Sequence, residues 1–90
     1  MHISGRNGRR DELMIMTNLL ANMFEPRRLT HILYSTNLSY GQLKKYLTSL
    51  QRMGLAEELS EPYRAFRTTD KGRAFIQLIA IEHDSIKVNP

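Results

Sequence analysis

Two short helical segments with very little chain between them constrain the fold most strongly. The first is expected over about 29–35 and the second over 39–53, so residues 36–38 leave room only for a tight turn. Ser39 offers a hydroxyl N-cap for the second segment. Gly54 supplies the left-handed residue that commonly ends a helix. The sequence therefore predicts two helices joined by a very short turn.

The second of these segments is amphipathic. Its apolar side chains cluster on one side of a helical wheel and comprise Leu43, Tyr46, Leu47 and Leu50. The opposite side is small, polar or basic and comprises Gly41, Lys45, Thr48 and Arg52, flanked by Lys44 and Ser49. One face is thus expected to enter a core while the other faces outward.

A longer helix is expected before this pair, from near Asp11 to about Phe24. Its apolar residues recur at spacings of three and four and comprise Leu13, Met16, Leu20 and Met23. Pro26 ends the helix, because the residue before a proline is driven out of helical geometry. Residues 1–10 hold three arginines and two glycines with few apolar side chains, which predicts a flexible basic segment.

The pattern changes from helix to strand after Gly54. Residues 55–59 and 63–68 are separated by Ser60-Glu61-Pro62, a composition typical of a turn, and predict a two-stranded hairpin. Thr69 can cap a final helix that is apolar on nearly every side. A helix of that kind must be covered on more than one face. We therefore expect a homodimer joined through its apolar residues, which are Phe75, Ile76, Leu78, Ile79 and Ile81.

The order helix, helix, helix, hairpin, helix predicts a mainly α fold with a small β-hairpin, that is, a winged helix-turn-helix. With 90 residues, 41% of them hydrophobic, the chain can build one core but not two. The expected domain covers residues 11–84 and includes the dimerisation helix. Residues 85–90 are expected to form a tail.

The charge distribution favours a polyanionic partner. The formal net charge is +4, and the stretch from Pro26 to Ala56 has no acidic residue. A surface built from that stretch is neutral or positive, which suits nucleic acid.

These features predict a DNA-binding surface centred on the helix at 39–53. Its N-terminal residues are small or polar and suited to approach base edges: Ser39, Tyr40, Gly41 and Gln42. Residues suited to the DNA backbone follow: Lys44, Lys45, Thr48 and Arg52. The hairpin adds Arg64 and Arg67, although Glu57, Glu58 and Glu61 lie in the same hairpin. In the alternative interpretation, the segment is an ordinary amphipathic core helix, and its basic face is merely exposed to solvent.

Several runs resemble the small winged helix-turn-helix transcriptional regulators of thermophilic archaea and of their viruses and plasmids. They are Thr30-His31-Ile32-Leu33-Tyr34, Asn37-Leu38-Ser39-Tyr40, Leu43, Tyr46-Leu47, Leu50, Gly54-Leu55 and Thr69-Asp70-Lys71-Gly72-Arg73-Ala74-Phe75. The resemblance covers roughly residues 9–80. It implies dimerisation through the last helix and DNA contacts from residues 39–52 and from the hairpin arginines. Gly41 departs from it by leaving one groove-facing position without a side chain.

Other classes of function are not supported by the residues. The chain has no cysteine, and its three histidines lack the spacing of a metal site, so no metal and no cofactor are expected. No phosphate loop, zinc-protease pattern or nucleophile with a base is present, so an enzyme is not expected. No apolar run is long enough to cross a bilayer, and the protein is expected to be cytoplasmic and associated with the nucleoid.

Three binding functions remain open at this point. The first is a double-stranded DNA-binding homodimer that regulates transcription or shapes DNA. The second is a winged-helix module that contacts protein in a larger assembly. The third is RNA binding, for which the sequence lacks an aromatic stacking platform.

Overall fold

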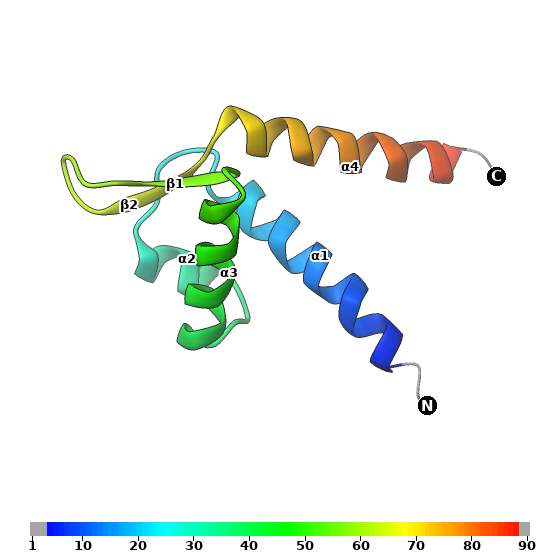
Figure 1. Ribbon diagram of the computed structural model, residues 1–90, viewed down its shortest axis with the longest axis horizontal. Coiled ribbons are helices and arrows are strands. Elements are labelled where there is room, and N and C mark those ends of the chain that lie inside the picture. The colour runs from blue at the N-terminus through cyan, green and yellow to red at the C-terminus, as the bar shows by residue number, and fades with distance from the viewer. Residues whose placement is uncertain (1–3, 89–90) are drawn as a thin grey trace.

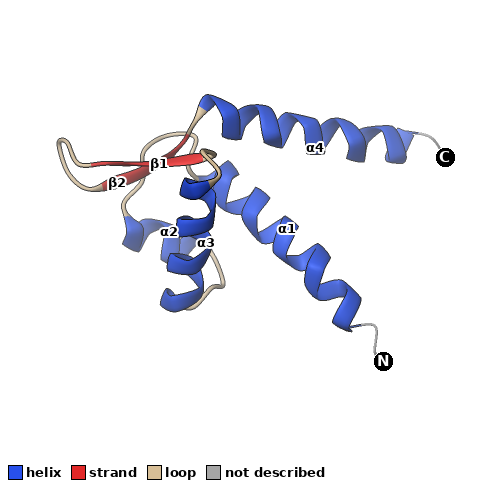
Figure 2. Cartoon of the chain, viewed as in Figure 1, coloured by secondary structure: helices blue, strands red, loops and turns tan. Residues whose placement is uncertain are grey.

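The computed structural model describes the backbone of residues 4–88 and the side chains of residues 12–80. Within these residues the chain forms four helices and one hairpin, in the order that the sequence predicts, and Figures 1 and 2 show how they are arranged. The elements are α1 (Ser4–Asn22), α2 (Leu29–Ser35), α3 (Tyr40–Arg52), β1 (Ala56–Leu59), β2 (Ala65–Thr68) and α4 (Asp70–Val88). The hairpin projects from one end of the molecule, and α4 runs away from its base in the opposite direction (Figure 1).

Helix α1 begins at Ser4, so the predicted start near Asp11 is wrong. Apolar periodicity locates a helix only where apolar residues recur, and residues 4–10 contain none. The flexibility expected of residues 1–10 stays a prediction. The C-terminal end at Asn22 lies close to the predicted end at Phe24.

The core lies where α1, α2 and α3 meet the base of the hairpin. Its buried residues are Leu19, Leu20, Met23, Ile32, Leu43, Tyr46, Leu47, Leu50, Leu55, Ala56 and Phe66. The predicted inward face of α1 is right for Leu20 and Met23 but wrong for Leu13, which is 40% exposed. Among the described side chains of α1, those that pack against the core begin at Ile15, and Leu19 joins the core there.

Helix α3 starts after Ser39 as the sequence predicts and ends at Arg52, one residue before the predicted end at Met53. Ser39 is its N-cap, and Gly54 follows its C-terminal end with a φ of 75°. The four residues that the helical wheel places inward are all buried: Leu43, Tyr46, Leu47 and Leu50. These contacts fix the rotation of α3, so its opposite face is set toward solvent.

Strands β1 and β2 are shorter than predicted, since they begin at Ala56 and Ala65. They pair antiparallel with Glu57 opposite Arg67 and Leu59 opposite Ala65. The backbone of Arg27 adds a bridge to β2, with hydrogen bonds of 3.0 and 2.8 Å to Phe66. This bridge attaches the hairpin to the segment that joins α1 to α2.

Thr69 caps α4 as expected, because its hydroxyl accepts a hydrogen bond from the Gly72 amide at 3.1 Å. Of the residues predicted to dimerise, Phe75, Ile76 and Ile79 are half-buried, and Leu78 is 59% exposed. The side chain of Ile81 lies outside the described residues. The described part of α4 therefore keeps exposed apolar surface.

Candidate nucleic-acid interface

The residues predicted to contact the DNA backbone lie together on the outward face of α3. Lys44, Lys45, Thr48 and Arg52 are all exposed, and α3 contains no acidic residue. Among the side chains of residues 12–80, both ion pairs lie in the hairpin, so no described carboxylate neutralises these three cations. This outward face can therefore attract a polyanion through Lys44, Lys45 and Arg52.

The N-terminal turn of α3 is held by a capping box. The hydroxyl of Ser39 accepts a hydrogen bond from the Gln42 amide at 3.2 Å. In return, Oε1 of Gln42 accepts one from the Ser39 amide at 3.1 Å. Both side chains therefore fix the start of the helix. The side-chain NH₂ of Gln42 takes no part in the box and is left to donate to a ligand.

Tyr40 lies exposed beside this turn. Its side chain is on the surface, with the residue 53% exposed. The ammonium of Lys44 lies 5.7 Å from the centre of its ring, within the range of a cation–π contact. The aromatic ring and the cation thus stand together at the N-terminal end of the outward face.

Arg64 is brought to the same side of the molecule as α3. A small cleft of about 160 Å³ separates α3 from the hairpin, and Lys44, Thr48 and Arg64 are among its lining residues. Glu58 lines the same cleft, and its Oε2 accepts a hydrogen bond from Nε of Arg64 at 2.5 Å. Arg64 can thus act with α3 on one ligand, but its guanidinium is already engaged by a carboxylate.

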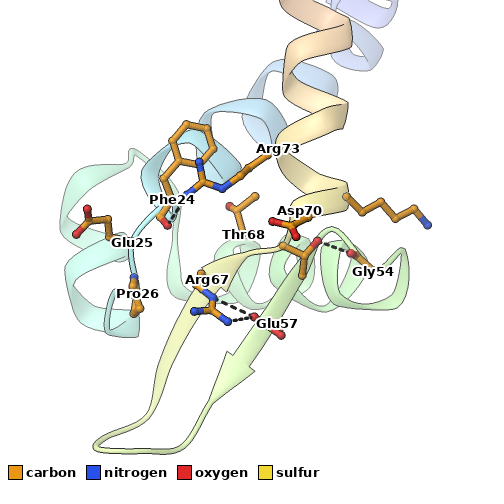
Figure 3. Close-up of a pocket in the computed structure, with 11 residues that line it drawn as sticks. Phe24, Glu25, Pro26, Gly54, Glu57, Arg67, Thr68, Asp70 and Arg73 are labelled. Atoms are coloured by element: carbon orange, nitrogen blue, oxygen red, sulfur yellow. Dashed lines mark hydrogen bonds and ion pairs between the residues drawn. The ribbon is translucent and has the colours of Figure 1, made fainter.

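Arg67 lies on the other face of the hairpin. Its Nε donates to Oε2 of Glu57 at 2.9 Å (Figure 3). Both residues line a cavity of about 730 Å³ between the hairpin and the start of α4. Because successive side chains of a strand alternate between faces, Arg64 and Arg67 cannot both face α3. The structure places Arg67 away from the other predicted DNA-binding residues.

The basic residues around this larger cavity are occupied by contacts within the chain. Arg73 donates to the carbonyl of Phe24 at 3.1 Å and stacks on its ring (Figure 3). Lys71 donates to the carbonyl of Met53 at 3.0 Å. The residues that line the cavity therefore hold α4 against the rest of the domain.

Arg28 is a candidate contact residue that the sequence reasoning passed over. It is exposed at the start of α2, and its guanidinium lies 4.1 Å from the centre of the Tyr63 ring in the hairpin turn. Its position in the acid-free stretch is the signal that could have identified it. The contact connects α2 to the hairpin turn and adds a cation at that end.

Comparison with protein families supports the fold assignment. Residues 9–86 match the family model described as winged helix-turn-helix. The chain belongs to this family. The comparisons with curated proteins and with solved structures give no match. A winged helix-turn-helix domain indicates DNA binding.

Two further observations bear on other functions. Among the described residues, no group of three or more histidine, cysteine, aspartate or glutamate side chains is placed to hold a metal ion. No helix in the described part of the chain is both long enough and apolar enough to span a membrane.

Proposed function

We propose that this winged helix-turn-helix protein binds double-stranded DNA by inserting α3 into the major groove. The single observation that carries the proposal is the outward face of α3. That face presents Lys44, Lys45 and Arg52 without a described carboxylate partner, and its opposite face is locked into the core. A helix held in this way is the element that the roughly 12 Å wide major groove accepts.

The hairpin supplies a second contact from the same side. Arg64 lies across the small cleft from Lys44 and Thr48, so a DNA backbone that passes the cleft meets residues from both elements. Such contacts fix the orientation of the protein on the duplex.

We further propose that the protein is a homodimer that regulates transcription, as a cytoplasmic, nucleoid-associated protein of archaeal type. Support for the dimer comes from an apolar groove of about 220 Å³ between α1 and α4, whose lining includes Leu13, Ile76 and Ile79. Leu78 and Met14 add exposed apolar surface on the same two helices. Two-fold symmetry would present two α3 helices to successive major grooves.

The test of DNA binding is a salt titration of duplex affinity with charge-removing variants. Lys45→Ala and Arg52→Ala should each weaken binding and lower the salt slope by about one unit, because each removes one phosphate contact. Arg67→Ala is the matched control, since it removes the same charge from the hairpin face that points away from α3.

The outcomes separate the two main classes of function. Weaker binding in the α3 variants with little change in Arg67→Ala supports the proposal. Salt-independent or absent duplex binding by the wild-type chain contradicts it and favours a module that contacts protein. Equal losses in all three variants would show that net charge, and not the face of α3, drives binding.

A further inference from the structure

The glycines between residues 12 and 80 serve different purposes. Among residues 12–80, the glycines are Gly41, Gly54 and Gly72. Gly54 has a φ of 75°, a conformation that other residues rarely adopt. At Gly72 a side chain would overlap the backbone carbonyl of Leu55. A larger residue would therefore be strained at Gly54 and would clash at Gly72.

Gly41 has no such structural reason. It lies in the first turn of α3, and apart from its two chain neighbours and the adjacent backbone of α3 no atom of the described chain lies within 4 Å of the position that a Cβ would occupy. Glycine in a helix is less stable than alanine because it loses more backbone entropy on folding. An alanine would fit the free protein and stabilise it.

The position of Gly41 connects it to the proposed DNA surface. It shares the outward face of α3 with Lys45, Thr48 and Arg52, at the end where base edges are read. Its exposed neighbours Tyr40 and Gln42 flank it. Gly41 is therefore the one residue of this face that leaves the backbone bare, and it lies in the turn with which a recognition helix generally contacts base edges.

We propose that Gly41 is a positioning residue that lets the first turn of α3 approach the base edges too closely for a methyl group. The inference rests on the proposed DNA binding and deepens it. Glycine is used where a backbone must come close to a ligand. Gly41 itself would not contact a base. The close approach that it allows would bring Tyr40 and the NH₂ of Gln42 within reach of the base edges.

The experiment compares Gly41→Ala and Gly41→Leu with the wild-type chain. The probe is a labelled duplex that the wild-type chain selects from a random-sequence library. Gly41→Ala should raise the melting temperature of the free protein by roughly 2–6 °C, because alanine is the better helix former. It should nevertheless weaken duplex binding about tenfold, the cost of forcing one methyl group into a filled contact. Gly41→Leu should weaken it further.

Two measurements serve as internal controls: the salt dependence of duplex binding, and duplex binding by the wild-type chain. Neither variant changes a charge, so the salt slope should equal that of the wild type. Duplex affinity of Gly41→Ala equal to or above the wild-type value overturns the inference, as does a changed salt slope. Failure of the wild-type chain to bind any duplex would instead overturn the proposed function, so the two failures are distinguishable.

Discussion

Replacing Gly72 by alanine should destabilise the domain, in contrast to the same change at Gly41. An added Cβ would overlap the carbonyl oxygen of Leu55 and would lie 2.6 Å from Cγ2 of Thr68. Carbon atoms in contact are normally about 3.5–4.0 Å apart, so the methyl group is roughly 1 Å too close. Thr68 is buried and the carbonyl belongs to the backbone, so neither can move aside freely.

The size of the stability loss in Gly72→Ala can be estimated from the groups that the added methyl group displaces. Overpacking of a core site costs about 1–3 kcal/mol. A shift of Leu55 also weakens the 3.0 Å hydrogen bond that its carbonyl accepts from the Thr69 amide, a loss of about 1 kcal/mol. The better helix propensity of alanine offsets about 1 kcal/mol of this loss. The net loss is about 1–3 kcal/mol, or roughly 5–20 °C in melting temperature for a domain of this size.

Urea unfolding of Gly72→Ala, followed by circular dichroism, measures this loss, and Gly41→Ala is the matched control. The free energy of unfolding should fall for the first variant and rise for the second. If Gly72→Ala were as stable as the wild type, α4 could not begin as close to Leu55 as the structure places it.

Two other predictions concern the hairpin and the dimer. Glu58→Gln should steepen the salt slope of duplex binding by about one unit, because it frees Arg64 to contact a phosphate, while stability changes by less than about 1 kcal/mol for an exposed ion pair. Glu57→Gln is its control, because its partner Arg67 faces away from α3, and equal effects would contradict the assignment of faces. Leu78→Glu should dissociate the proposed dimer in sedimentation experiments without unfolding the protomer, since Leu78 is 59% exposed. Gln77→Glu is the control, because it places the same charge on a neighbouring exposed residue. A Leu78→Glu chain that stays dimeric would show that the dimer uses another surface.

The helix-turn-helix could be predicted from the sequence because its signals are local. The cap at Ser39, the stop at Gly54 and the alternation of buried and outward residues in α3 all act within one or two turns of the chain. Local side-chain and backbone chemistry is enough to define such a helix. The predicted rotation of α3, and hence its outward face, is confirmed by the buried residues.

The limits of α1 and the hairpin depend on contacts that are distant in sequence. Leu13 fits the periodic pattern as well as Leu20 does, but it is 40% exposed, whereas Leu20 lies in the core. In β2, Ala65 and Phe66 are neighbours with opposite orientations, yet both are buried. No alternation rule applied to a single strand can foresee this, because it depends on what covers each face.

The candidate site also combines features that local sequence predicts with features that depend on contacts distant in sequence. Strand alternation already separates Arg64 from Arg67 in the sequence, but it does not say which of the two faces α3. That choice follows from the docking of the hairpin, and so does the stacking of Arg28 on Tyr63. The pairing of both hairpin arginines with glutamates depends on the strand register.

The attachment of β2 explains why the two faces of the hairpin can be tested separately. The Thr68 amide donates to the carbonyl of Met23 at 2.8 Å, and the Thr68 hydroxyl donates to the carbonyl of Leu20 at 2.6 Å. Two residues earlier in β2, Phe66 exchanges two backbone hydrogen bonds with Arg27. The base of the hairpin is thus fixed to the end of α1 and to the segment before α2, and buried hydrogen bonds of this kind resist rearrangement. Because the base does not depend on Glu57 or Glu58, removing either carboxylate changes the charge on one face and leaves the hairpin in place. A difference in DNA affinity between Glu57→Gln and Glu58→Gln therefore reports which face of the hairpin meets the duplex.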